Sequence, residues 1–280
     1  MRVHLCGVRG STPAPGPEFL RYGGHTSCVA IVHDGQTRPS LILDVGTGVR
    51  SVTKLLEGEA FQGTILLTHL HWDHVQGLPF FAAGDNDSAS VKLMLPEQED
   101  GSDAETVLER AMSPPHFPMS PRQIRGGWTF ATLAEGEIQI EGFEVLALEI
   151  PHKGGRTFGY RVSDSSSTFT YMPDHCPTEL GPGEEGWGAC HPNALALAKG
   201  SDALAHDAQL LNAQELANEG RFGHAAADYA VELGRRAGVR KTLFFHHRPD
   251  RTDTQLDELA ARFAPDSGVR IAVQDAILEL

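Results

Sequence analysis

The feature that most limits how this chain can fold is a cluster of metal-binding residue types directly after an apolar strand. Residues 64–67 form an apolar, strand-like run, and the next seven residues contain three histidines and an aspartate. Strand ends are where a rigid scaffold presents ligands. In an extended segment His69 and His71 point to the same side, whereas Asp73 and His74 lie beyond the bend. The spacing therefore predicts that the first pair serves one metal ion and the second pair another.

The side chains of this cluster limit the ions that it could hold. Imidazole and carboxylate groups suit zinc, manganese or iron, and the absence of cysteine from the cluster argues against a structural zinc site of the thiolate type. The chain has four cysteines at irregular spacings and no CxxC pair: Cys6, Cys28, Cys176 and Cys190. This pattern predicts buried or inert thiols and no disulfide framework.

Charge and apolar patterning narrow the class of protein. The 280 residues include 23 Lys and Arg against 37 Asp and Glu, a formal net charge of −14. A chain this acidic repels a phosphate backbone at long range, so a nucleic-acid partner is not expected. No window reaches the roughly 18 apolar residues of a membrane span, and the start of the chain lacks the apolar run of a signal peptide. The expected location is the cytoplasm, away from membranes.

The order of the apolar runs predicts the fold class. Runs bounded by turn residues predict strands, the first two of them joined as a hairpin, at 28–32, 41–43, 64–67, 128–133, 137–140, 143–150, 160–162, 168–172, 203–205 and 242–245. Helices are expected at 75–83, at 193–199, from His224 to a terminating Gly238, and from Thr254 onward. Two sets of strands, each followed by helices, favour an α+β fold in which two mixed sheets lie between helical layers, within one domain of residues 1–280.

Residues 85–127 are the least regular part of the chain. They contain a helix that is expected to begin at a capping box, Ser102 with Glu105, and a proline-rich stretch at 113–121. Because a long irregular insertion in a compact domain is usually functional, we expect this segment to fold as a lid over the metal-binding cluster.

The cluster resembles a known family signature. Residues 68–74, Thr-His-Leu-His-Trp-Asp-His, resemble the HxHxDH motif of the metallo-β-lactamase-fold hydrolases, whose αββα sandwich is the architecture expected above. Later motifs of the family find matches at His152, Asp174 and His246, each after a predicted strand. The resemblance therefore extends over nearly the whole chain.

The resemblance implies a dinuclear metal centre. It assigns His69, His71 and His152 to the first ion and Asp73, His74 and His246 to the second, with Asp174 and a hydroxide between the two. The ions would be two divalent cations, zinc in the first place, with manganese or iron as alternatives. His247 adjoins His246 and is an alternative ligand; the strand-then-histidine pattern favours His246.

Two further motifs resemble one branch of the family, that of ribonuclease Z and cyclic phosphodiesterases. Residues 205–208, Ala-His-Asp-Ala, and 223–225, Gly-His-Ala, match the motifs in which an acidic residue orients a histidine at the scissile phosphate. Asp207 and His224 would be this pair, and together with Asp73 they form the implied catalytic set. A carboxylate keeps an adjacent imidazole protonated near neutral pH, so the imidazole can donate a proton to a leaving oxygen. The alternative is that His224 caps a helix and Asp207 ends a strand.

These features predict a phosphodiesterase that uses a metal-bridging hydroxide on a small or cyclic nucleotide-like substrate. The chain lacks the long Gly/Pro-rich arm with which ribonuclease Z holds tRNA, so the resemblance does not extend to a nucleic-acid partner. The alternatives are hydrolysis of a lactone, thioester or β-lactam, an iron-dependent oxidoreductase on the same fold, and a sensor without enzymatic activity. A homodimer is compatible with the sequence, and the role of His25 in the Gly-rich turn at 22–28 is left open.

Overall fold

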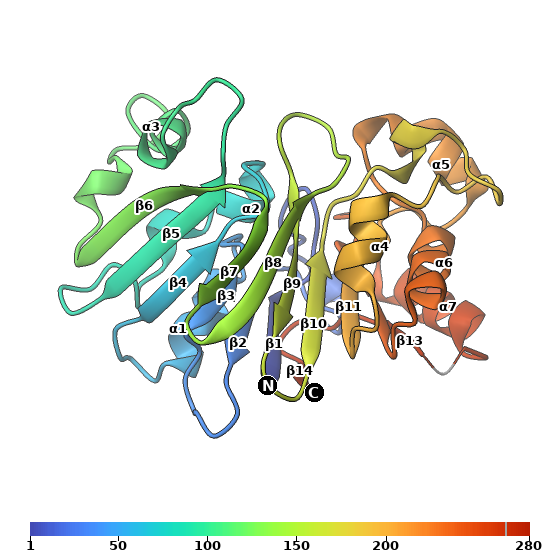
Figure 1. The fold of residues 1–280 in the computed structure, drawn as a ribbon, viewed down its shortest axis with the longest axis horizontal. Coiled ribbons are helices and arrows are strands. Elements are labelled where there is room, and N and C mark those ends of the chain that lie inside the picture. Colours follow the sequence, from blue (N-terminus) through green and yellow to red (C-terminus); the bar gives the residue numbers. More distant parts are fainter. Residues whose placement is uncertain (267) are drawn as a thin grey trace.

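The computed structural model describes residues 1–266 and 268–280, and these contain two seven-stranded sheets packed face to face (Figure 1). The first sheet has the spatial order β14 (Ile277–Glu279), β1 (Arg2–Gly7), β2 (Cys28–Val32), β3 (Leu41–Leu43), β4 (Gln62–Leu66), β5 (Ser90–Pro96), β6 (Gly127–Leu133). The second has the order β13 (Val269–Ile271), β12 (Thr242–Phe245), β11 (Ala203–Asp207), β10 (Thr168–Met172), β9 (Phe158–Ser163), β8 (Phe143–Glu149), β7 (Gly136–Ile140).

Helices cover the outer faces of the sheets (Figure 1). The α-helices of the described residues are α1 (Val49–Leu55), α2 (Trp72–Val75), α3 (Ala104–Glu109), α4 (Pro192–Ala198), α5 (Ala213–Glu219), α6 (Ala227–Ala237) and α7 (Asp253–Phe263). Short 3₁₀ helices lie at η1 (Pro17–Phe19), η2 (Leu78–Phe80), η3 (Pro121–Gln123), η4 (Pro177–Leu180) and η5 (Gly220–Phe222). No helix in this part of the chain is long and apolar enough to cross a membrane.

Separate apolar layers hold the sandwich together. The central layer joins the inner faces of the two sheets, with Leu5 and Ile31 from the first and Phe158 and Phe245 from the second, all nearly inaccessible to solvent. A second layer packs α1 on the outside of the first sheet, and a third packs α4 and α6 on the outside of the second. Because each sheet buries both faces, the arrangement has four layers. The predicted αββα sandwich is confirmed.

Strand direction explains where polar residues gather. In the first sheet β3, β4, β5 and β6 are parallel neighbours. In the second, β10, β11 and β12 are parallel, and β8 runs in the same direction because both β8 and β10 are antiparallel to β9. The carboxyl ends of parallel strands meet at one edge, where open α/β sheets bind their ligands.

The structure corrects the description of residues 85–127 as an irregular insertion. Within this segment β5 pairs in parallel with both β4 and β6, so it is an integral strand of the first sheet. The buried side chains of Val91, Leu93 and Leu95 account for this placement. Helix α3 is capped by Asp103, whose carboxylate accepts a hydrogen bond from the Thr106 N–H at 2.9 Å, and not by Ser102. The role of the remaining segment as a lid stays a prediction.

Other boundaries differ from the predicted ones by a turn or less. The expected helix at 75–83 is divided between α2 and η2. Helix α7 begins two residues earlier than expected, because Thr252 and Gln255 form its capping box. The hairpin of β2 and β3 is confirmed, and α6 ends at Gly238 in the left-handed conformation, as expected.

Candidate metal centre

The predicted metal-binding cluster lies on the turn that connects β4 to α2. His69 follows β4, and His71 is the residue that precedes the single turn of α2. The Val45 N–H donates to the His74 carbonyl at 2.8 Å, which fixes this turn against the end of β3. As a result Asp73 and His74 are buried at the carboxyl edge of the first sheet.

Three histidines from both sheets form the first group. His69 and His71 meet His152, which follows β8, and the three candidate ligand atoms lie within 4.8 Å of one another. The Nε2 atom of His152 is 3.3 Å from Nδ1 of His71. The structure thus brings together the residues that the family resemblance assigned to one ion.

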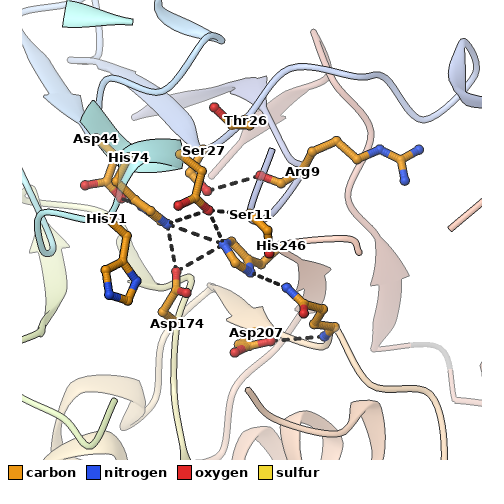
Figure 2. Close-up of polar contacts among 12 residues, drawn as sticks. Arg9, Ser11, Thr26, Ser27, Asp44, His71, His74, Asp174, Asp207 and His246 are labelled. Atoms are coloured by element: carbon orange, nitrogen blue, oxygen red, sulfur yellow. Dashed lines mark hydrogen bonds and ion pairs between the residues drawn. The ribbon is translucent and has the colours of Figure 1, made fainter. Parts of the chain in front are cut away.

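A second group consists of Asp73, His74 and His246. Figure 2 shows His74 and His246 pointing toward each other. The Nε2 atoms of His74 and His246 face each other at 3.3 Å, and His246 Nε2 lies 3.0 Å from Asp73 Oδ2. His246 has a positive φ of 58°, a conformation that residues other than glycine adopt mainly where the surroundings impose it. The backbone at the end of β12 is therefore held so that this imidazole enters the cluster.

Asp174 lies between the two groups. Its Oδ2 is 2.9 Å from His74 Nε2 and 3.3 Å from His246 Nε2, while Oδ1 is 3.5 Å from His152 Nε2. Each carboxylate oxygen therefore faces one group. This is the arrangement expected of a bridging carboxylate.

Asp44 is a buried residue of this site that sequence reasoning did not assign. Its Oδ2 is 2.7 Å from His74 Nδ1, and Oδ1 accepts a hydrogen bond from the Thr68 N–H at 2.7 Å. A carboxylate on Nδ1 fixes the ring of a metal-binding histidine and leaves Nε2 free. Because β3 and β4 are parallel neighbours, the position of Asp44 at the end of the predicted strand 41–43 was a usable signal.

Backbone and amide groups orient two other imidazoles. Nδ1 of His152 is 2.8 Å from the Gly223 carbonyl, and the amide of Gln209 lies 3.1 Å from Nδ1 of His246. In both rings Nε2 remains directed into the cluster. A Cβ atom at Gly10 would lie 2.3 Å from His246 Nδ1, which explains why the loop after β1 has a glycine there.

The electrostatics of the cluster match the requirements of a cation. Burial lowers the pKa of His69 and brings that of His152 to about 4, so both rings are neutral. Burial alone would lower the pKa of His74 too, but the neighbouring carboxylates raise it well above its usual range. The carboxylates are those of Asp73, Asp174 and Asp44. The cluster thus holds an excess of buried negative charge. Without another cation this charge is balanced by a proton on His74, and a bound metal ion would replace that proton.

A second observation, independent of the pKa shifts, supports a divalent metal ion at this cluster. Among the described residues, His69 Nε2 is buried and has no hydrogen-bond partner. Unsatisfied buried polar atoms are rare and call for an explanation such as an ion. Neutral imidazoles with carboxylates are the ligands that zinc, manganese and iron share.

Asp207 and His224 form a pair beside the cluster. His224 Nδ1 lies 3.0 Å from Asp207 Oδ2. The Asp207 carboxylate also accepts hydrogen bonds from the backbone N–H groups of His175, Gln209 and Ala225, so its orientation is fixed. Burial by itself would lower the pKa of His224, but the charge of Asp207 and its hydrogen bond raise the pKa to about 9. The contacts of this ring therefore favour its protonated form.

Neighbouring histidines occupy different positions. His247 Nε2 lies 2.8 Å from the Ala272 carbonyl, so its ring is engaged away from the cluster and the geometry favours His246 as the ligand. Nδ1 of His25 lies 3.1 Å from the Thr47 hydroxyl oxygen. His206 is buried and contacts His175 through a ring nitrogen at 3.0 Å.

Two cavities open onto the cluster. One, of about 340 Å³, is lined by Asp73, Asp174, His224 and His246 among others. A larger one of about 700 Å³ shares His224 with it and extends toward Phe222. At the rim the Ser11 N–H donates to Asp73 Oδ2 at 2.6 Å. The candidate ligands and His224 are thus accessible to a small molecule.

Comparison with known proteins identifies the family. Residues 53–247 match the model of the β-lactamase superfamily domain, and the chain belongs to this superfamily. Among curated proteins it is similar to ribonuclease Z of Exiguobacterium sibiricum, at 29% identity over 213 residues, 65% of this chain and 70% of the relative.

Solved structures share the fold. The metallo-β-lactamase-fold protein YhfI from Bacillus subtilis superposes with a TM-score of 0.71 at 16% identity, over 99% of both chains. A diphosphatase of the PhnP family superposes with a TM-score of 0.67 at 17% identity, over 100% of this chain and 97% of the diphosphatase. The predicted family resemblance is confirmed, and the chain is a metallo-β-lactamase-fold hydrolase.

We expect the purified protein to bind about two divalent ions per chain, because two groups of three candidate ligands both lie against the Asp174 carboxylate. Metal analysis after reconstitution with zinc or manganese measures this stoichiometry. The variant His247→Gln serves as a control, because His247 lies outside both groups, and it should retain the full metal content. A ratio that stays near one would contradict the two-ion assignment.

Proposed function

We propose that the protein is a dinuclear metal-dependent phosphodiesterase that acts on small substrates. The observation that carries this proposal is the Asp207–His224 pair, which places a protonated imidazole at the edge of the two ligand groups. Hydrolysis of an uncharged ester would not need a second cationic group at this place. The similarity to a relative named ribonuclease Z supports the same chemistry.

The cluster residues would hold the ions and position the substrate. The first ion would be held by His69, His71 and His152, the second by Asp73, His74 and His246, with Asp174 shared. When bound, two divalent cations would supply positive charge to a phosphate and lower the pKa of water. The side chains of Asp44 and Gln209 and the Gly223 carbonyl keep the imidazoles in place.

His224 would act on the leaving group. Its Nδ1 is committed to Asp207, so Nε2 carries the proton that faces the cavities. A protonated imidazole there would neutralise phosphate charge and donate its proton to the departing oxygen. Asp207 would hold the ring in this tautomer and stabilise the cation, as a carboxylate does for a general acid–base histidine.

Charge and cavity size support a small substrate over a polynucleotide. The chain has a formal net charge of −14. At the rim of the larger cavity Arg248 already forms ion pairs with Glu219 and Asp250, both at 2.7 Å. Such an arginine does not extend a basic track for a phosphate backbone. A homodimer and a cytoplasmic location stay predictions.

A substrate panel on metal-reconstituted protein tests the proposal. We expect hydrolysis of bis(p-nitrophenyl) phosphate and of a 2′,3′-cyclic nucleotide, with less activity on p-nitrophenyl phosphate, a γ-lactone or a thioester. Single-stranded RNA of 20 nucleotides is the test of a polymeric substrate. Turnover confined to the lactone or thioester would refute the phosphodiesterase assignment, and turnover confined to RNA would refute the small-substrate assignment.

A further inference from the structure

A third cavity, of about 330 Å³, adjoins the metal cavity and has no role in the proposed chemistry. Its lining is mainly apolar and includes Trp72, Val75, Phe80, Leu108, Met112 and Phe117. We propose that this aryl pocket, as we call the cavity, binds an uncharged aromatic ring of the substrate. The inference rests on the proposed function and deepens it, because it makes the substrate a phosphoester with an apolar aryl group.

Trp72 connects the aryl pocket to the metal cavity. It lines both of them and stands in sequence between His71 and Asp73. The single turn of α2 thus buries Asp73 and His74 in the cluster and contributes Trp72 and Val75 to the wall of the aryl pocket. Because the two cavities share this wall, a ring in the aryl pocket and a phosphoryl group at the metal centre would belong to one substrate molecule.

The aromatic side chains of the pocket are unusually exposed. Trp72 is 77% exposed and Phe80 61% exposed. The Phe80 and Phe117 rings form an edge-to-face pair with centroids 5.9 Å apart. Exposed apolar patches of this kind often mark binding grooves, and a further ring could stack or pack edge-on against these faces.

The lining has few hydrogen-bonding side chains, and two of them already make hydrogen bonds. The Thr47 hydroxyl oxygen accepts a hydrogen bond from the Thr26 N–H at 2.9 Å, and the Gln76 amide donates to the Thr26 hydroxyl oxygen at 3.3 Å. A nucleobase would find few partners there for its polar edges, and burying polar groups without partners is costly. An uncharged aryl group has no such edges, so the pocket favours it over a base.

The far wall comes from the segment that was predicted to be a lid. Leu108 and Met112 are buried, whereas Ala111 is exposed at the edge of the pocket. A larger side chain at Ala111 would therefore enter the pocket without displacing core residues. This position offers a variant that blocks the aryl pocket alone.

Equilibrium binding of two phosphonates tests the inference without requiring turnover. Calorimetric titration of the metal-loaded protein compares phenylphosphonate with methylphosphonate, which present similar charge and differ in the ring. We expect phenylphosphonate to bind about tenfold more tightly, because added apolar groups in a pocket typically give ~10–200-fold discrimination. Ala111→Trp should reduce this ratio to near one, and Ile277→Ala, an exposed apolar site on β14, should retain it.

A second variant keeps the test informative if Ala111→Trp does not fold. Trp72 is largely exposed, so Trp72→Ala should fold normally by circular dichroism and lower the phenyl-to-methyl ratio. Equal affinities in the parent protein, or an unchanged ratio in folded variants, would overturn the aryl pocket. If the ratio behaves as expected but no phosphodiester is hydrolysed, the pocket stands and the proposed function fails. If a phosphodiester is hydrolysed but the two phosphonates bind with equal affinity, the proposed function stands and the aryl pocket fails.

Discussion

Replacement of Asp174 by alanine should abolish turnover and lower the affinity for both metal ions. This carboxylate places one oxygen against each ligand group, so its loss removes a ligand from both and reduces the negative charge of the cluster. Removal of a residue that only orients a ligand typically lowers metal affinity or activity ~10–100-fold. Removal of a ligand shared by both groups should lower them by more than this. Steady-state hydrolysis of bis(p-nitrophenyl) phosphate and metal analysis measure the two effects. His69→Ala should also abolish turnover.

The cysteines provide matched controls for this loss. All four are free thiols, with Cys6, Cys28 and Cys176 buried. Cys176 lies two residues after Asp174, yet its Sγ contacts Thr178 at 3.7 Å and no candidate ligand. Cys176→Ser and Cys190→Ser should therefore retain metal and activity. A large loss of activity in either serine variant with metal retained would show that the site has been assigned incorrectly.

Replacement of His224 by alanine should lower kcat on a phosphodiester and leave both metal ions bound. General acid catalysis typically contributes ~10²–10⁴-fold, and the variant should lose most of it. Without the ring the Asp207 carboxylate keeps its hydrogen bonds from three backbone N–H groups, so the variant should still fold, and thermal unfolding measures the stability that is lost. Parental rates on every phosphodiester would rule out the assigned role.

The double variant Asp207→Ala/His224→Ala distinguishes a functional unit from two separate contributions. Groups that act together are strongly non-additive, so the double variant should be little slower than His224→Ala alone. An activated leaving group such as p-nitrophenolate needs less protonation. The defect should therefore shrink on such substrates if His224 is a general acid, and persist if it mainly binds phosphate charge.

Much of the site could be predicted because each ligand follows an apolar strand. His152, Asp174 and His246 come after β8, β10 and β12, and the shared direction of these strands places the three side chains at one edge. Asp207 follows the same rule because it ends β11, whereas His224 follows η5 and was assigned from the Gly-His-Ala motif. The apolar runs predicted the ranges of these strands, so the sequence alone indicated that the residues after them lie close together.

Other features depended on tertiary contacts that no local pattern encodes. Strand β5 carries a local signal, the alternating Val91, Leu93 and Leu95, but its place between β4 and β6 is known only from its pairing. The choice between His246 and His247 depends on a left-handed backbone at His246, which directs the two rings to different sides. The aryl pocket was not predicted. It forms between Trp72 and residues at the end of α3 and beyond, and this contact between distant parts of the chain has no local sequence signal.

The peptide that precedes His224 serves two parts of the site at once. The Gly223 carbonyl holds the ring of His152, and the next residue, His224, is the proposed proton donor. Gly223 itself is left-handed, with φ of 93°, and a Cβ there would lie 2.7 Å from the Lys153 side chain and 3.2 Å from His152 Nδ1. The position of His224 and the orientation of His152 in the first ligand group therefore depend on the same backbone. A substitution that moves this backbone would change both the proposed proton donor and a candidate metal ligand.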